Sequence, residues 1–525
     1  MTITFSPSKA SATLASLVVT VALTAPVASY AAPMSSSPAP LAAPAAARGC
    51  SDDETNSYVR GLNYKPEDVL KRDGEKITNP PKSEGEMKDG VFRVITKNRR
   101  TISNKSTDIA ATNSTASTIY PGALLLGDKN FVENQPTIIN MERKPLTMSV
   151  NLPGMDGKAN SETVKNPTRS DTNGSLNTLL ERWNKDYAPK YPNPPATMQY
   201  NETMAYTQDQ LIAKFGVGSA VPITKLGVDF TGIREGKKQT SVVSFKQIFY
   251  TASVNDPGSP SDMIGHSVCG KGLKERGVNA SAPPLYVSSV SYGRQMYVKL
   301  ETSSTSSKVE AAFKAIVKGV DISGNVEYQK ILANSNFRAI VLGGSSKGQS
   351  EVITGKLSEL KKVINADANY SRTNPGVPIS YTAKFLKDNS QAAVHNNSEY
   401  VETKVTTYRN GKINLAHKGG YVARFKVGWD EIAYENGEEK KTRKEWDGNG
   451  KNRTAPFNTV IPLPANARNI TVFAEEATGL AWEPWRTVRD DKDLPLTKER
   501  NIAIWGTTLH PKSDNKVPED KTPED

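Results

Sequence analysis

Cysteine and histidine are scarce in this chain, which has two cysteines and four histidines among its 525 residues. Protein zinc sites use several such side chains at short ligand spacing. The histidines are scattered, and nowhere do several such side chains lie together in the sequence, so we expect no metal ion and no other cofactor. No apolar run of about 18 residues follows residue 50, which excludes a membrane-spanning helix. We expect the mature chain to be soluble, so it must refold if it enters a membrane.

Apolar residues are also under-represented, at 37% of the chain. This proportion favours thin, elongated or sheet-rich domains over one large core, and the length fits about three or four domains. The net charge of +12 is compatible with simple solubility or with an anionic partner. The basic run at residues 97–100 lacks the aromatic side chains that accompany nucleic-acid surfaces. We therefore interpret it as a solvated strand end and expect no nucleic-acid partner.

The N-terminus predicts export. Lys9 precedes an apolar run from Leu14 to Val27, and Ser29-Tyr30-Ala31 offers a cleavage site between small residues. We predict a signal peptide at residues 1–31, followed by a disordered linker rich in Ala, Pro and Ser at residues 32–50. Because Cys50 adjoins that linker, we do not expect a disulfide between Cys50 and Cys269.

One motif suggests an enzyme. Residues 344–348 fit the G-x-S-x-G pattern of a serine hydrolase, with Ser346 as the nucleophile and three histidines, His395, His417 and His510, downstream. The chain lacks the repeated strand–helix alternation that builds a hydrolase sheet, and no pair of carboxylates stands out by spacing. We therefore expect no catalytic residue and no enzyme, and keep a secreted serine hydrolase only as an alternative.

Two segments, residues 218–247 and 308–328, carry conflicting signals. In the first, Leu226, Val228 and Phe230 alternate with polar residues or glycine, as in a strand. The second alternates as well, yet it is rich in Ala and Lys and so favours a helix. An ordinary amphipathic helix would explain it, but a lipid-crossing hairpin of a barrel also requires alternation. Such a conflict is expected where a segment changes conformation.

Other regions give simpler patterns. Helical periodicity predicts helices at residues 175–186 and 350–363. From about residue 409 to 512, short strands separated by Asn-Gly and Asp-Gly turns predict a compact β-sandwich that contains five of the six tryptophans. The charged, Pro-containing tail at residues 513–525 is predicted to be disordered.

The segment Glu476-Ala477-Thr478-Gly479-Leu480-Ala481-Trp482-Glu483-Pro484-Trp485-Arg486 places two tryptophans in an otherwise polar stretch. Gly479 and Pro484 argue against a helix interior, so we predict a loop that exposes apolar groups. Tryptophan favours the boundary between water and lipid. The segment resembles the Trp-rich undecapeptide of the cholesterol-dependent cytolysins, secreted bacterial toxins that open large pores in cholesterol-containing membranes. Residues 506–509 resemble the membrane-facing Thr-Leu loop of the same family.

The resemblance extends from about residue 55 to 512, and it implies the α+β fold of that family. This fold is an elongated four-domain chain with a central bent antiparallel sheet flanked by helical bundles, and a C-terminal β-sandwich. The implied boundaries are residues 51–67, 103–203, 251–294 and 370–392 for domain 1, 68–102 and 393–408 for the β-rich domain 2, 204–250 and 295–369 for the pore-forming domain 3, and 409–512 for the membrane-binding domain 4. The two ambivalent segments would be helical in the soluble form and would become transmembrane hairpins in the pore.

The resemblance also implies residue roles. Thr508 and Leu509 would bind cholesterol, and the undecapeptide would anchor in the membrane interface through Trp482, Trp485 and Leu480. Arg486 would couple membrane docking to assembly. The tips at residues 419–420 and 455–457 would dip shallowly into the bilayer. For oligomerisation, the resemblance implicates Gly343 and Gly344 at a sheet edge and the stacking rings of Tyr206 and Phe337.

Two positions depart from the family pattern. The usual undecapeptide cysteine is Ala477, so we expect lysis to survive an alkylating agent. The usual tryptophan before the last one is Pro484, as in members that use a human GPI-anchored complement inhibitor as receptor. The Tyr-x-Tyr element of those members is not evident here, because Tyr434 is followed by Glu435 and Asn436.

The sequence therefore predicts a secreted, cholesterol-dependent pore-forming toxin that inserts into host cell membranes. Its expected partners are membrane cholesterol and further copies of itself in a large ring, formed from a soluble monomer or weak dimer. A glycan or glycoprotein co-receptor stays open. The alternative from another functional class is a non-lytic module that binds a sterol or a glycan.

Overall fold

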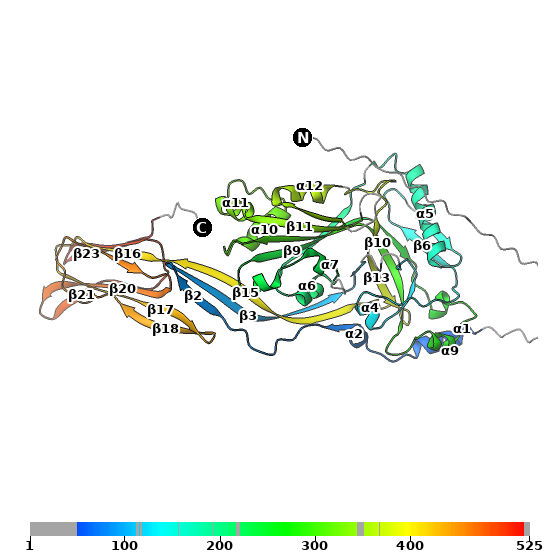
Figure 1. Cartoon of the computed structure of the whole chain (residues 1–525), viewed down its shortest axis with the longest axis horizontal. Coiled ribbons are helices and arrows are strands. Elements are labelled where there is room, and N and C mark those ends of the chain that lie inside the picture. The colour runs from blue at the N-terminus through cyan, green and yellow to red at the C-terminus, as the bar shows by residue number, and fades with distance from the viewer. Residues whose placement is uncertain are drawn as a thin grey trace, which may run out of the picture. The chain divides into compact units, whose positions relative to one another are not determined.

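The computed structural model describes residues 50–111, 115, 118–155, 157–192, 194–216, 221–343, 351–366 and 368–518 (Figure 1). The predicted signal peptide, all of the predicted linker except Cys50, and residues 519–525 lie outside the described part. The same holds for Gly344 and Ser346. In the described part of the chain, no helix combines the length and the apolar character that a membrane span requires.

Eleven strands form the central sheet, and its core is the run β12-β11-β10-β9. The longest members are β9 (Gln239–Val254) and β10 (Pro284–Thr302), which pair antiparallel. Their neighbours are β8 (Thr197–Met204), β11 (Ser335–Leu342) and β12 (Glu351–Lys356). The remaining strands are β4 (Ile109–Ala110), β5 (Leu124–Leu126), β6 (Leu146–Val150), β7 (Ser161–Val164), β13 (Val377–Phe385) and β14 (Gln391–Ala392).

A register shift interrupts the β9–β10 ladder between Tyr292 and Gly293. Only glycine fits at position 293, because an added Cβ would lie 1.9 Å from the carbonyl oxygen of Gln247. Extra residues in a ladder bend the strand and increase its twist. The predicted central antiparallel sheet is confirmed, and β9 and β10 both extend across the boundaries predicted between domains 1 and 3.

Helices cover both faces of the central strands (Figure 1). On one face, α6 (Gln208–Phe215), α7 (Val221–Leu226) and α8 (Phe230–Arg234) pack on Val242, Tyr297 and Ile340. On the other face, α10 (Val309–Val317) and α11 (Val326–Ala333) pack on the adjacent residues Val243, Met296 and Val341. Successive side chains of a strand point to opposite faces, so these strands are apolar on both sides and need a cover on both.

Both ambivalent segments contain helices in this form, but neither is helical throughout. The first contains α7 and α8, but its last residues already belong to strand β9, which begins at Gln239. The second contains α10 and the beginning of α11.

The helix predicted at residues 350–363 is wrong in its first half. Residues 351–356 form β12, which pairs with β11 from Val341↔Glu351 to Asn336↔Lys356. The β-branched Val352, Ile353 and Thr354 suit a strand. The edge of β11 also supplies backbone hydrogen bonds, and helical periodicity within the segment cannot predict such non-local pairing. Helix begins only at η3 (Leu357–Glu359) and α12 (Leu360–Asn365). The helix predicted at residues 175–186 is confirmed as part of α5 (Arg169–Asp186), whose N-cap is Thr168.

A separate four-stranded sheet contains β1 (Lys71–Asp73), β2 (Glu84–Lys88), β3 (Val91–Ser106) and β15 (Val394–Arg409). β3 and β15 pair along their whole length. The basic run at residues 97–100 lies in the middle of β3 and not at a strand end. Across the ladder, Arg99 pairs with Glu399 at 2.6 Å and Arg100 with Glu402 at 2.9 Å, which accounts for the charge cluster without an external partner.

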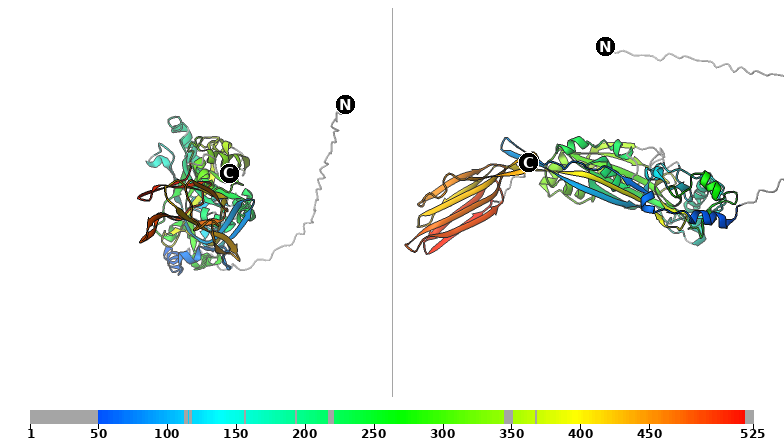
Figure 2. Two further views of the ribbon diagram at one scale, coloured as in Figure 1. Left: turned by 90° about the vertical axis from the view of Figure 1, so that its left-hand side faces the viewer. Right: turned by 90° about the horizontal axis from the view of Figure 1, so that it is seen from below.

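The C-terminal β-sandwich is confirmed as two sheets with the strand orders β19-β16-β22-β23 and β18-β17-β20-β21 (Figure 2). The strands are β16 (Gly411–His417), β17 (Ala423–Glu435), β18 (Glu438–Glu445), β19 (Phe457–Leu463), β20 (Ala467–Leu480), β21 (Glu483–Leu494), β22 (Arg500–Thr507) and β23 (His510–Lys516). Alternate residues such as Phe425, Val472 and Ile504 form its core. Residues 513–516, predicted as disordered tail, are the second half of β23, because they pair with β22.

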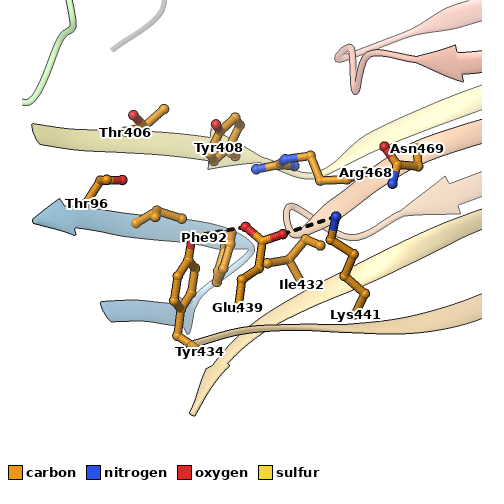
Figure 3. A pocket seen from close by; sticks show the side chains of 11 residues that line it. Phe92, Thr96, Thr406, Tyr408, Ile432, Tyr434, Glu439, Lys441, Arg468 and Asn469 are labelled. Atoms are coloured by element: carbon orange, nitrogen blue, oxygen red, sulfur yellow. Dashed lines mark hydrogen bonds and ion pairs between the residues drawn. The ribbon is translucent and has the colours of Figure 1, made fainter. Parts of the chain in front are cut away.

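A small apolar cluster of Phe92, Val94, Ile432 and Ala465 joins the β3–β15 sheet to the sandwich. Beside it lies a pocket of about 290 Å³ (Figure 3). Arg468 stacks over the Tyr408 ring at 3.5 Å, and Glu439 lies between the hydroxyl of Tyr434 and the ammonium group of Lys441.

The prediction about the cysteines is wrong: Cys50 and Cys269 form a disulfide. Cys50 lies next to Cys269 because α1 (Asp52–Arg60) docks beside η2 (Pro260–Met263) and α9 (Gly270–Glu275). Val59 of α1 is fully buried, and the Tyr58 hydroxyl donates to the Val278 carbonyl at 2.8 Å. The remaining short helices are α2 (Pro66–Val69), α4 (Lys129–Val132) and η1 (Gly157–Asn160).

Candidate functional site

Four chain segments meet at one end of the sandwich. The end of β16 pairs with both the start of β19 and the end of β22, through His417↔Phe457 and His417↔Ile504. Gly420 donates its backbone N–H to the Gly506 carbonyl at 2.8 Å. The predicted tips at residues 419–420 and 455–457 therefore lie at the same end as the loop at residues 506–509. The undecapeptide joins them, because Arg486 contacts Thr508.

The undecapeptide is a hairpin end and not the irregular loop that we predicted. Strand β20 continues to Leu480 and β21 begins at Glu483, so only Ala481 and Trp482 form the turn. The ladder is irregular between Ala477 and Leu480, where Gly479 has a φ of +80°. Glycine adopts this left-handed conformation without steric strain, which lets the strand bulge and continue. Pro484 lies on the exposed side of β21, the last strand of its sheet, so its missing N–H is tolerated.

Trp482 and Leu509 project into solvent. Their exposed fractions of 82% and 78% are the highest among the large apolar side chains of the described residues. Exposed apolar groups that gather at one place mark a surface that contacts another molecule or a membrane. The site thus presents one aromatic and one aliphatic side chain from two neighbouring hairpins.

The other predicted anchors are held more tightly. Trp485 lies beneath the guanidinium group of Arg424, which is 3.8 Å from its ring centroid. Leu480 is half-buried, and its N–H donates to the Thr478 hydroxyl at 3.0 Å. Trp482 is therefore the undecapeptide side chain that is free to insert into another phase without breaking a contact within the chain.

Glycine is required where β22 turns into the loop at residues 506–509. Gly506 has a φ of +97°, and an added Cβ would lie 2.3 Å from the His510 carbonyl oxygen. This tight approach closes the hairpin between β22 and β23, and it places Thr508 half-buried and Leu509 exposed at its tip.

Arg486 connects the two hairpins. Its guanidinium group donates to the Thr508 carbonyl at 3.0 Å, and it pairs with Glu483 at 3.0 Å and with Glu476 at 3.5 Å. Both carboxylates belong to the undecapeptide, whereas Thr508 belongs to the neighbouring loop. A displacement of either hairpin therefore changes the surroundings of Arg486.

Glu476 is the unusual partner, because its side chain is completely buried. Neither carboxylate oxygen has a hydrogen bond within the described residues, and Arg486 is the cation beside it. Burial raises the pKa of Glu476, Arg486 lowers it in part, and Glu483 raises it further. We named Glu476 only as part of the undecapeptide and missed this role. The alternation along β20 could have indicated that Glu476 is buried. Ile470, Val472 and Ala474 face the core at every second position, and Glu476 continues that series.

His417 holds the neighbouring tip. Its ring is fully buried, its Nε2 contacts the Tyr421 carbonyl at 2.8 Å, and its Nδ1 accepts from the Gly419 N–H. Burial lowers the pKa of His417, in keeping with a neutral ring that donates through one nitrogen and accepts through the other. The histidine is thus occupied as a structural clamp.

The residues predicted to serve oligomerisation lie apart from this end, on and beside the central sheet. Tyr206 stacks on Tyr400 at 5.5 Å between ring centroids, and Phe337 is 2% exposed beneath the helices of one face. Gly343 has a φ of +78° and approaches the Gly293 carbonyl closely. For Phe337 to contact another copy, the segments that cover it must first move.

Comparison with known proteins places these features in a family. The family model described as thiol-activated cytolysin matches residues 54–408, and that of its beta sandwich domain matches residues 412–512. Together they cover most of the chain. The chain belongs to the thiol-activated, or cholesterol-dependent, cytolysin family.

Individual relatives match the sequence of this cytolysin over most of its length. Seeligeriolysin from Listeria seeligeri is 49% identical over 89% of the chain and 88% of its own length, and listeriolysin O from Listeria monocytogenes is 48% identical over the same shares. The crystal structure of the human-specific toxin intermedilysin matches with a TM-score of 0.82 and 44% identity, over 89% of this chain and 99% of that one. That of pneumolysin matches with a TM-score of 0.78 and 42% identity, over 89% and 100%.

The family membership establishes the protein as a cholesterol-dependent pore-forming cytolysin and not as either of the two alternatives. The family is one of toxins and not of enzymes. The serine suggested as a nucleophile, Ser346, lies outside the described residues.

We predict that Glu476→Gln uncouples the two hairpins of this cytolysin. The neutral amide no longer attracts Arg486, so dye release from cholesterol-containing liposomes should fall about tenfold, which corresponds to roughly 1.4 kcal/mol, while liposome binding stays unchanged. Glu438→Gln, at an exposed position on β18 of the same sheet, is the matched control. Unchanged release by Glu476→Gln would contradict the role.

Thermal unfolding tests the same residue independently. Because burial raises the pKa of Glu476, its ionised form destabilises the folded sandwich above that pKa. The wild-type protein should therefore gain stability relative to Glu476→Gln as the pH falls through the raised pKa towards the ordinary value of 4.5. A stability difference that does not vary with pH would show that folding does not raise the pKa of this carboxylate.

Proposed function

We propose that the chain is secreted, docks on host membranes by binding cholesterol through Thr508 and Leu509, assembles into a large ring of identical copies and inserts a transmembrane β-barrel. The observation that carries this proposal is the pair of exposed side chains, Trp482 and Leu509, on two hairpins that Arg486 connects. No enzymatic step is part of this function, and cholesterol is the primary receptor.

Docking follows from the chemistry of the loop at residues 506–509. The Thr508 hydroxyl can exchange a hydrogen bond with the sterol hydroxyl, while Leu509 packs on the apolar rings. Moving an exposed side chain of this size out of water contributes roughly 1.5–3 kcal/mol. Leu509 and Trp482 together therefore supply weak attachment for one copy, and many copies in a ring supply firm attachment.

The register of β10 and β11 supports insertion of one hairpin. These strands pair up to Thr302↔Ser335, and residues 303–334, with α10 and α11, lie between. If the same register continued, these residues would form two arms of about 16 residues, each ~50 Å long at ~3.3 Å per residue. The hydrocarbon core of a bilayer is ~30 Å thick, so the arms would be long enough to cross it.

The second hairpin would arise in the same way from β8 and β9. Their register ends at Met204↔Ser241, and residues 205–240, with α6, α7 and α8, lie between. Two arms of about 18 residues would result, which exceeds the 9–11 residues that a tilted strand needs to cross. In lipid, every backbone group of such hairpins must be paired, so closure of many copies into a barrel is required.

Assembly needs a free strand edge. β12 covers the edge of β11, and it is joined to β11 through Gly343 and the residues that follow. We propose that β12 leaves this edge so that a neighbouring copy can pair there, with Gly343 and Gly344 giving the backbone the necessary freedom. Phe337 and Tyr206 would then become available to stack between copies.

A protein receptor in addition to cholesterol is left open. One solved structure shows a disulfide-locked mutant of intermedilysin with human CD59, and it matches this chain with a TM-score of 0.73 and 42% identity, over 89% of this chain and 99% of that one. Here Tyr434 is followed by Glu435 and Asn436, and its hydroxyl contacts Glu439. We therefore propose cholesterol as the determinant of binding.

Liposome leakage tests the proposal. Dye release should require cholesterol, and Thr508→Gly with Leu509→Gly should weaken liposome binding at least about tenfold by removing roughly 1.5–3 kcal/mol of apolar contact. The fold should persist, because Arg486 bonds to the backbone carbonyl of Thr508, which the glycine variant keeps. Val460→Ala, which truncates an exposed apolar side chain on β19, is the control. Equal release without cholesterol would refute the proposal, and sterol binding without leakage would refute the insertion step.

A reversible lock tests the refolding of residues 303–334. The hydroxyl oxygens of Thr305 and Thr407 lie 3.5 Å apart, with Thr407 on β15. In Thr305→Cys with Thr407→Cys, an engineered disulfide should tether the first arm, so that release stops while liposome binding continues, and reduction should restore release. The wild-type protein and each single-cysteine variant, with and without reductant, control for the native disulfide. Full release by the oxidised double variant would rule out extension of this arm.

A further inference from the structure

One sheet of the sandwich carries two lysines and a tryptophan close to the end that presents the exposed tips. β22 pairs with β23 at Trp505↔Lys512. On its other side, β22 pairs with β16 up to His417↔Ile504, and the N–H of Lys418 donates to the Ile504 carbonyl at 2.8 Å. Lys418 therefore lies one position beyond that ladder, opposite Trp505. Three adjacent chain segments thus place Lys418, Trp505 and Lys512 side by side, and we call these three residues the basic row.

The side chains of the basic row point away from the core. His417 and Ile504, which precede Lys418 and Trp505, are buried, and successive side chains of a strand point to opposite faces. Both lysines are exposed, and Trp505 is half-buried. Because neighbouring strands lie ~4.8 Å apart, the two lysines flank the indole with their Cα atoms about 10 Å from each other.

No acidic side chain neutralises the two lysines of the basic row. Among the described residues, neither of them forms an ion pair. Towards the other end of the same sheet, by contrast, Lys412 pairs with Glu499 at 2.9 Å and Lys516 with Asp514 at 2.5 Å. Asp514 lies two positions from Lys512 on the same face of β23, but Lys516 is its partner. The charge of the basic row is therefore available to a partner outside the chain.

The basic row lies behind the exposed tip of its own hairpin. Leu509 follows Trp505 by four residues and precedes Lys512 by three, so at ~3.3 Å per residue the row is about 10 Å from the tip. The polar headgroups of a bilayer occupy roughly 5–7 Å on each side of the hydrocarbon core. A hairpin that enters the hydrocarbon with Leu509 therefore holds the row among the headgroups. Tryptophan favours that layer, and lysine side chains extend their ammonium groups into it.

We propose that the basic row binds the phosphate groups of anionic lipids, so that docking is favoured on membranes that expose such lipids together with cholesterol. This inference rests on the proposed docking of the sandwich end on a membrane. Anionic lipids fit because two uncompensated ammonium groups face the layer that contains their phosphates. In phosphatidylcholine, the choline cation offsets the phosphate charge, so this lipid gives the row little net attraction.

The test compares binding of the purified full-length protein to two kinds of cholesterol-containing vesicle. One contains phosphatidylcholine alone, and in the other phosphatidylserine replaces part of it. Each lysine should contribute about fivefold to a preference for the anionic vesicles, which corresponds to roughly 1 kcal/mol. Lys418→Gln with Lys512→Gln should therefore lose about 25-fold of this preference and bind neutral vesicles like the wild type. Added sodium chloride should weaken the wild-type preference.

Matched variants separate the basic row from the net charge of the protein. Lys444→Gln with Lys516→Gln removes the same charge from exposed positions on β18 and β23 outside the row, and it should keep the preference. Lys418→Arg with Lys512→Arg should keep it as well, because the charge stays in place. Equal losses in the two glutamine variants would assign the preference to net charge and overturn the proposal.

The same measurements distinguish a failure of this inference from a failure of the proposed docking. Wild-type protein that binds neutral cholesterol vesicles and gains nothing from phosphatidylserine would overturn the role of the basic row alone. Wild-type protein that binds neither vesicle would refute docking on cholesterol and this inference with it. If the double glutamine variant differed from the wild type only on erythrocytes, and sialidase removed the difference, the partner would be an anionic glycan and the proposal would be wrong.

Discussion

The central strands β9, β10 and β11 are apolar on both faces, and much of the molecule is arranged to cover them. Val242 and Val243 are neighbours in sequence, yet they belong to different cores, one beneath α6, α7 and α8 and the other beneath α10 and α11. Those helices lie in the chain segments that link the same strands. The residues that cover the sheet as helices are therefore the same residues that we propose extend it as strands. Such a conversion would leave the order of the strands unchanged.

The sandwich end differs from the sheet, because it exposes apolar groups at the tips of two hairpins that share one cation. Trp482 and Leu509 are presented by hairpins of different sheets, β20–β21 and β22–β23. Arg486 is shared between them through two carboxylates and one carbonyl. Glu476 adds a buried charge whose balance depends on that one cation, so the link is sensitive to small displacements. The hydrogen bonds of His417 and the close backbone approach at Gly506 hold the neighbouring tips in place.

Much of this organisation could be predicted from the sequence, where a local pattern and a family motif agreed. The sandwich follows from its turn residues and the helix over residues 175–186 from periodicity. The helical state of residues 309–317 follows from their Ala- and Lys-rich composition, against an alternating pattern that indicated a strand. Non-local contacts explain the failures. Residues 351–356 became a strand because the edge of β11 was available, and residues 513–516 became ordered by pairing with β22. Cys50 met Cys269 because α1 docks on segments more than 200 residues away. The undecapeptide looked like a loop since Gly479 and Pro484 disfavour helices, although both are compatible with an irregular edge hairpin.

The disulfide gives the molecule a property that depends on its compartment. Outside cells such a bond persists, whereas cytosolic glutathione and thioredoxin keep thiols reduced. A copy that reaches a reducing cytosol retains α1 only through noncovalent contacts such as those of Tyr58 and Val59. Detachment of α1 then requires less free energy, so the contacts of α1 with the rest of the chain are weaker in a reducing compartment than in an oxidising one.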